Sequence, residues 1–168
     1  MNCNVPYVRA WCVADRRDHL QQLIDGYKFT NARSAYKPLT SLLHDRLPDL
    51  PPDTIIVPIP TVNAHIRQRG YDHMLLIARQ LGKLRSLRVS TALQRATSTK
   101  QRDASRSKRI AQAKTAFTCP ERLSSGSTYL LIDDVITTGA TMHHGAQTLL
   151  NAGAGTVWIA TISRQPLD

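Results

Sequence analysis

Two adjacent carboxylates, Asp133 and Asp134, stand between an apolar run and a turn that is rich in hydroxyl groups. The turn, residues 137–141, reads Thr-Thr-Gly-Ala-Thr and leads into an amphipathic segment. A turn that opens a helix aims several backbone N–H groups at one point and favours a phosphate there. Adjacent carboxylates repel each other unless hydroxyl groups or a metal ion satisfy them, which suits a sugar diol, a hydrated Mg²⁺ ion or both. The segment therefore predicts a phosphate site beside a diol site, the alternative being an ordinary strand-to-helix turn capped by Thr and Asp.

The elements around this turn must hold it at the edge of a sheet. Residues 129–132 indicate a short buried strand, and residues 142–152 have the periodicity of an amphipathic helix. The periodicity elsewhere predicts helices at 15–29, 38–47 and 72–85, a short helix ending near 113, and strands at 54–60, 88–93 and 156–162. Strands that alternate with helices imply an α/β fold with a mainly parallel sheet covered on both faces.

Ligands in such a fold bind beyond the carboxyl ends of the strands. The acidic pair lies at one such end, and the loop that follows Pro60 lies at another. We expect the two to converge on one crevice if their strands are neighbours. Residues 96–107 have almost nothing to bury, which predicts a mobile loop.

Composition and charge restrict the class of protein. The chain has 168 residues, enough for one domain, and a net charge of +10. Residues 65–114 hold thirteen Arg and Lys against two Asp, so this region could attract a diphosphate or a nucleic-acid backbone, or be merely a solvated basic surface. The three cysteines have no spacing typical of a disulfide framework or a zinc site. No apolar run approaches the ~20 residues of a membrane span and no signal pattern is present, which predicts a cytoplasmic protein.

The segment around the acidic pair closely resembles the phosphoribosyl diphosphate (PRPP) motif of type I phosphoribosyltransferases. The resemblance implies the type I fold, with a helical N-terminal hood at residues 1–52 and a PRPP-binding core at 53–168 of a single domain. It also implies that Asp133 and Asp134 hold the ribose hydroxyls and, indirectly, Mg²⁺. The 5-phosphate would then be bound by Thr137, Thr138, Gly139, Ala140 and Thr141.

A second stretch, Val-Pro-Ile-Pro at 57–60 and Arg-Gln-Arg-Gly-Tyr-Asp-His at 67–73, is similar to the ComF-like phosphoribosyltransferases associated with bacterial competence. By this resemblance the first loop and the mobile loop bind the diphosphate of PRPP. The residues implied are Thr61, Val62, Arg67, Arg69, Lys100 and Arg102. A structural alternative for Arg69 is a pair with Asp72, with Gly70 serving as a turn.

The chain departs from the ComF-like pattern at several positions. Asp72 and His73 replace the usual Asn-Gln, and Val62 and Ala64 replace the usual His and Arg of the first loop. The cysteine-rich zinc ribbon of longer members is missing, so no zinc is expected. Thr137 stands where enzymes that salvage 6-oxopurines have an Asp that acts as base, which disfavours that reaction.

Two functions follow from these observations. The first is a Mg²⁺-dependent transferase that moves the 5-phosphoribosyl group from PRPP to an unidentified acceptor, with no convincing general base in the sequence. The second is a ComF-like protein without catalytic activity that serves DNA uptake or nucleotide sensing, in which the basic region contacts single-stranded DNA or other competence proteins. The sequence leaves open whether the chain forms a homodimer.

Overall fold

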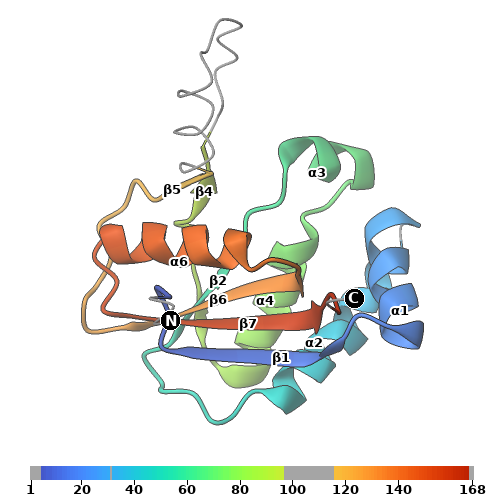
Figure 1. The fold of residues 1–168 in the computed structure, drawn as a ribbon, viewed down its shortest axis with the longest axis horizontal. Coiled ribbons are helices and arrows are strands. Elements are labelled where there is room, and N and C mark those ends of the chain that lie inside the picture. Colours follow the sequence, from blue (N-terminus) through green and yellow to red (C-terminus); the bar gives the residue numbers. More distant parts are fainter. Residues whose placement is uncertain (1–4, 31, 97–115, 167–168) are drawn as a thin grey trace, which may run out of the picture.

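The computed structural model of the protein describes residues 5–30, 32–96 and 116–166 (Figure 1). Five parallel strands form the main sheet in the order β1-β7-β6-β2-β3, and β4 and β5 form a small antiparallel ribbon. The elements in chain order are β1 (Arg9–Asp15), α1 (Asp18–Phe29), the 3₁₀ helix η1 (Arg33–Ala35), α2 (Tyr36–Arg46), β2 (Ile55–Pro58), α3 (Asn63–Arg69), α4 (His73–Arg85), β3 (Arg88–Val89), β4 (Gln94–Arg95), β5 (Phe117–Thr118), β6 (Thr128–Ile136), α6 (Ala140–Asn151) and β7 (Thr156–Arg164).

The centre of the sheet is the apolar strand β6, which pairs with β2 on one side and β7 on the other. Alternate residues of a strand face opposite sides, so β6 contributes to two cores. Leu130 and Ile132 belong to the core that includes residues of α1, α2 and α4, while Tyr129 and Leu131 belong to the core beneath α6. Figure 1 shows α6 on one face of the sheet and α2 and α4 on the other. The predicted α/β fold, a mainly parallel sheet flanked by helices, is confirmed.

The N-terminal segment differs from the prediction. The expected helices are present as α1 and α2, but β1 precedes them and adds an edge strand parallel to β7. Trp11 of β1 packs edge-on against Trp158 of β7, with the ring centroids 5.5 Å apart. The helix α2 packs on α4, β1 and β7, so it covers the sheet rather than its end. Within residues 5–52, β1 therefore belongs to the sheet and α2 to the layer that covers it.

The loop after β2 also differs from the prediction. Residues 63–69 form the short helix α3, which has no buried residue and stands away from the sheet in Figure 1. The strand expected at 88–93 is reduced to the two residues of β3. The expected mobile loop and the short helix ending near 113 lie almost wholly outside the described residues. Within the described ranges, no helix is long and apolar enough to cross a membrane.

Candidate functional site

The acidic pair lies near the carboxyl end of β6, inside the strand rather than after it. Asp133 is in register with Thr161 of β7, and the backbone carbonyl of Asp134 accepts a hydrogen bond from the Ser163 hydroxyl at 3.1 Å. Because consecutive strand residues face opposite sides, the two carboxylates do not project together. Asp134 is 4% exposed and belongs to the face covered by α1 and α4, whereas Asp133 is partly exposed.

Two side chains from the first half of the chain hold the Asp134 carboxylate. Its Oδ2 lies 2.8 Å from Nζ of Lys28 in α1 and 2.7 Å from Nε2 of His73 at the start of α4. Burial alone would raise the pKa of Asp134, but the His73 hydrogen bond and the Lys28 charge outweigh it and hold that pKa well below its usual range. Asp134 is therefore ionised and already paired.

Asp133 is in the opposite electrostatic situation. Burial and the charge of neighbouring Asp134 raise the pKa of Asp133 to about 8. Its Oδ1 accepts a hydrogen bond from the Asp134 backbone N–H at 2.9 Å. A carboxylate disfavoured in this way is stabilised by a cation or by hydroxyl donors. Asp133 is thus the member of the pair that is best suited to receive a ligand.

The residues present could hold Mg²⁺ only if a bound substrate and waters supplied most of its ligands. Among the described residues, no group of three or more His, Cys, Asp or Glu side chains could hold a metal ion. Magnesium ions in phosphate sites are commonly held by one or two carboxylates, waters and substrate oxygens. The Asp133 carboxylate meets that requirement, and Lys28 and His73 already occupy Oδ2 of Asp134.

The predicted phosphate turn joins β6 directly to α6. Gly139 precedes the first helical residue, Ala140, with a φ of +78°, a left-handed conformation that glycine adopts without strain. The side chains of Thr137, Thr138 and Thr141 are exposed, and the Thr138 hydroxyl accepts a weak hydrogen bond of 3.4 Å from the Ala140 N–H. The first turn of α6 has no acidic residue, so nothing there would repel an anion.

The predicted diphosphate loop contains a helix, and the four residues predicted there differ in accessibility. Thr61 is 8% exposed and donates a hydrogen bond to Asp72 at 2.7 Å. Val62 is 38% exposed and precedes α3, and Arg67 on α3 is exposed. Arg69 lies 3.2 Å from Nδ1 of His73. Arg69 and Thr61 therefore lie beside His73, which in turn contacts Asp134, whereas Arg67 is exposed on α3.

The structural alternative for Arg69 is only half right. Gly70 ends α3 with a φ of +78°, as a turn residue would. Asp72, however, accepts hydrogen bonds from the backbone N–H groups of Met74 and Leu75, and thereby caps α4. Its third partner is Thr61, and the Arg69 guanidinium instead lies 5.8 Å from the Phe29 ring centroid.

Three contributors to the site were not anticipated. Lys28 and His73 contact Asp134 although they lie 106 and 61 residues away along the chain. No feature of the sequence pointed to Lys28, and for His73 the only signal was its departure from the ComF-like pattern. Arg95 donates a hydrogen bond to the carbonyl of Pro60 at 2.8 Å and helps to lower the pKa of Asp133 against the larger effect of burial. Lys100 and Arg102 lie outside the described residues.

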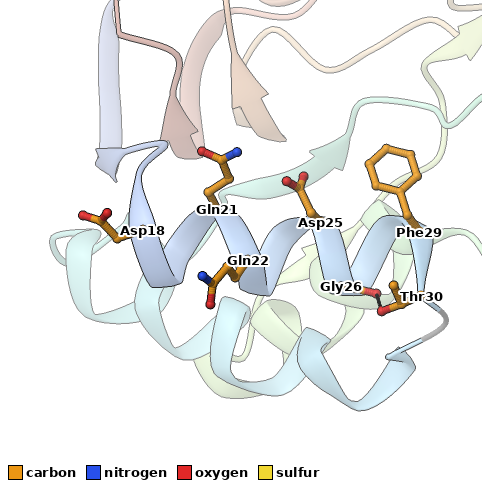
Figure 2. Close-up of a pocket in the computed structure, with 7 residues that line it drawn as sticks. All are labelled: Asp18, Gln21, Gln22, Asp25, Gly26, Phe29 and Thr30. Atoms are coloured by element: carbon orange, nitrogen blue, oxygen red, sulfur yellow. Dashed lines mark hydrogen bonds between the residues drawn. The ribbon is translucent and has the colours of Figure 1, made fainter.

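A separate hollow of about 610 Å³ lies on the outer side of α1, and Figure 2 shows its lining side chains. Its described lining includes Asp18 and Asp25 together with Phe29, and no Lys or Arg. Asp25 is paired with Arg16 outside this lining, and a lining whose charged groups are all carboxylates does not suit a phosphate. The hollow is therefore distinct from the site around the acidic pair.

Comparison with known proteins agrees with this geometry. The sequence profile of the phosphoribosyl transferase domain matches residues 69–167. The fold is similar to that of glutamine PRPP amidotransferase from B. subtilis, solved in complex with ADP and GMP, with a TM-score of 0.54 and 17% sequence identity. The match covers 76% of this chain but only 26% of the amidotransferase chain, so this chain spans about a quarter of that protein. A comparison with curated protein sequences found no match.

Proposed function

Because this chain belongs to the phosphoribosyl transferase domain family, we propose that it binds PRPP with Mg²⁺ and transfers the 5-phosphoribosyl group to an acceptor nucleophile. One observation carries this proposal. The acidic pair lies near the carboxyl end of the central strand β6, and only residues 137–139 separate the last strand residue, Ile136, from the first residue of α6, Ala140. A site for a diol and a site for a phosphate are thus joined by a few residues of one rigid element, as the two ends of a ribose 5-phosphate require.

The 5-phosphate would lie at the amino end of α6. Thr137, Thr138 and Thr141 offer hydroxyl donors there, and Gly139 and Ala140 allow the backbone to approach closely. The ribose would lie beside Asp133, with the acidic pair as its polar boundary. Supporting this orientation, the raised pKa of Asp133 means that its ionised form is destabilised in the free protein, and a hydroxyl or cation that reaches the carboxylate would stabilise that form.

The diphosphate would leave toward the loop after β2. Thr61, Val62, Arg67 and Arg69 are the residues proposed for it, with Lys100 and Arg102 as predicted partners in the segment outside the described residues. A departing diphosphate accumulates negative charge, which fixed cations stabilise best when they are already in place. Asp133 is the residue that would hold Mg²⁺, which would supply charge neutralisation for the leaving group when bound.

The protein's own groups would chiefly bind and orient the substrate. Thr137 occupies the position where 6-oxopurine enzymes have an acid, so the proposed reaction needs an acceptor that is nucleophilic without that base. We also propose that the chain is ComF-like, because the Val-Pro-Ile-Pro run at 57–60 forms the end of β2 and leads into the proposed diphosphate loop. The departure at positions 72 and 73 is accommodated by the Asp72 cap and by the contact of His73 with Asp134.

Calorimetric titration with PRPP and Mg²⁺ tests the proposal. We expect saturable binding that is weakened at least tenfold when Asp133 and Asp134 are both replaced by Asn, which equals ~1.4 kcal/mol. Lys83→Met removes one exposed cation from α4 and serves as the matched control, with unchanged affinity expected. Absence of binding by the native chain, or an affinity that the double Asn variant leaves unchanged, would refute the proposed function.

The alternative is a non-catalytic competence protein that binds single-stranded DNA, and the net charge of +10 favours it. Exposed cations of the described residues are spread over several elements; they include Arg67, Arg79, Lys83, Arg88 and Arg95. Several phosphate contacts would make DNA affinity fall steeply as salt is raised. A gel-shift series against salt separates the functions, because a flat or absent response would exclude several phosphate contacts between these cations and DNA.

A further inference from the structure

The Asp134 carboxylate is the point where three segments of the chain meet. Lys28 reaches it from α1 at 2.8 Å, and His73 reaches it from the start of α4 at 2.7 Å. The other ring nitrogen of His73 faces Arg69 at 3.2 Å and Thr61 at 3.1 Å. The hydrogen-bonded chain therefore runs from the predicted diphosphate loop, through the imidazole, to the acidic pair and α1.

The donor and acceptor properties of these groups determine the tautomer of His73. A guanidinium can only donate, so the contact with Arg69 requires Nδ1 to act as acceptor. The Thr61 hydroxyl gives its single proton to Asp72, so Arg69 is the donor to Nδ1 and Thr61 only lies beside it. The ring proton then lies on Nε2 and is donated to Asp134. The backbone at His73 is held as well, because the Tyr27 hydroxyl donates to the His73 carbonyl at 2.7 Å and the Tyr71 hydroxyl donates to the Tyr27 carbonyl at 2.6 Å.

These contacts leave the two adjacent carboxylates in unequal positions. Asp134 is buried with both a cation and an imidazole on one oxygen, whereas Asp133 faces the other side of the strand and is partly exposed. A ligand could reach Oδ2 of Asp134 only by displacing Lys28 or His73. Removing a charged partner from a buried carboxylate is strongly unfavourable.

We propose that the acidic pair has divided roles: Asp133 alone receives the ribose and its metal, while Asp134, held by the positioning residues His73 and Lys28, fastens α1 over the site. This inference rests on the proposed function for the role of Asp133. The fastening role of Asp134 is independent of PRPP and can be tested in the free protein. It also explains why a chain that lacks the Asn-Gln of ComF-like proteins keeps a hydrogen-bond donor at position 73.

The fastening role predicts that Asp134→Asn loosens α1 and that Asp133→Asn does not. Hydrogen exchange of the Ile24 and Tyr27 amides should become about 10- to 100-fold faster in Asp134→Asn, the range for loss of a charge-assisted hydrogen bond. Lys28→Met should have the same effect. Lys83→Met, on the exposed surface of α4, is the matched control and should leave exchange unchanged.

The role of His73 is tested by a spectroscopic signal and by rescue. The ¹⁵N spectrum of the His73 ring should show the Nε2-protonated tautomer, which should persist in Asp133→Asn and change in Asp134→Asn. His73→Gln keeps a donor and should retain slow exchange in α1, whereas His73→Leu should lose it. Because the leucine variant could fail to fold, the glutamine variant and the ring spectrum of the native chain decide the matter.

The affinities for PRPP with Mg²⁺ then test the division. Asp133→Asn should weaken binding at least about tenfold, and Asp134→Asn by a smaller factor equal to that of Lys28→Met. Equal losses in Asp133→Asn and Asp134→Asn, or unchanged exchange and ring spectrum in Asp134→Asn, would overturn the division. If the native chain binds no PRPP, the proposed function fails, and the exchange and ring measurements still decide whether Asp134 fastens α1.

Discussion

Gly139 permits a sharp prediction because a second glycine provides its control. Both Gly139 and Gly70 have a φ of +78°, and each is found at a helix terminus. A Cβ added at Gly139 would meet only Ile136 Cδ1 at 3.7 Å, an ordinary contact, and one added at Gly70 would meet nothing within 4 Å. Replacement by Ala therefore introduces backbone strain without a steric clash at either position.

The expected cost follows from that geometry. The left-handed conformation costs a residue with a Cβ roughly 1–2 kcal/mol, so Gly139→Ala and Gly70→Ala should each lower the free energy of unfolding by about that amount. For a chain of this size, 1 kcal/mol corresponds to a shift in Tm of about 2–4 °C. Asn tolerates this conformation better than other residues, and Gly139→Asn should therefore cost less than Gly139→Ala.

The same strain limits the effect on ligand affinity. If the Gly139→Ala turn keeps its shape, stability falls by the full amount and affinity for PRPP with Mg²⁺ is unchanged. If the turn relaxes, restoring it on binding weakens affinity by no more than the same roughly 1–2 kcal/mol, about 5- to 30-fold. In Gly139→Ala, the loss in free energy of unfolding and the loss in binding free energy should therefore sum to the strain of roughly 1–2 kcal/mol. Gly70→Ala should show only the loss in free energy of unfolding.

Urea denaturation and calorimetric titration of the three variants provide the two measurements. A loss of affinity greater than about 100-fold in Gly139→Ala would exceed the strain available and show that the Cβ itself blocks the ligand. A Gly139→Ala variant as stable and as tight-binding as the native chain would contradict the assigned turn conformation. Either result would refute the reasoning.

Three further predictions concern charge, capping and packing. The pKa of Asp133 is raised to about 8, so the folded state retains a proton that the unfolded chain loses above pH ~4. The free energy of unfolding should therefore fall as the pH rises from about 4 to 8. Urea denaturation at a series of pH values should show this decline in the native chain and not in Asp133→Asn. Arg85→Ala removes hydrogen bonds to three backbone carbonyls at the end of α2 and to the ring of His44, so it should lower Tm through a loss of about 1–3 kcal/mol, whereas Arg88→Ala at an exposed site should not. Leu131→Ala empties a fully buried position in β6 and should cost about 2–5 kcal/mol by the same measurement, and a cost below 1 kcal/mol would contradict the assigned core.

The periodic parts of the fold were predictable because their apolar residues record which face is buried. The helix at 72–85 and the strand at 156–162 appear as α4 and β7 with shifts of one or two residues at their ends. By contrast, the edge strand β1 was not predicted, although its residues 10–14 form an apolar run, Ala-Trp-Cys-Val-Ala, because a run of this length does not by itself distinguish a strand from other buried segments. The helix α3 has no buried residue, and hydrophobic periodicity cannot reveal a helix that buries no apolar side chain.

The candidate site was predictable where its residues are contiguous. Residues 133–141 carry the acidic pair, the glycine turn and the start of α6 in one segment, so their chemistry could be read without a fold. Strand alternation, however, separates the two carboxylates, and that depends on β6 continuing through both of them to Ile136. Asp is disfavoured in strands, so local propensity ends β6 earlier than its pairing with β7 does.

The contacts of Asp134 couple parts of the molecule that the proposed reaction would use at different moments. Lys28 connects α1 to Oδ2 of Asp134, and His73, which lies beside Thr61 of the loop after β2, contacts the same oxygen. A ligand that drew Arg69 toward a diphosphate would withdraw the donor that faces Nδ1 of His73, and the ring would become a weaker donor to Asp134. Binding of the diphosphate and attachment of α1 to Asp134 would then be linked through the His73 imidazole. If an acceptor molecule contacts α1, thermodynamic reciprocity requires that it change the affinity for PRPP by the same factor by which PRPP changes the affinity for the acceptor.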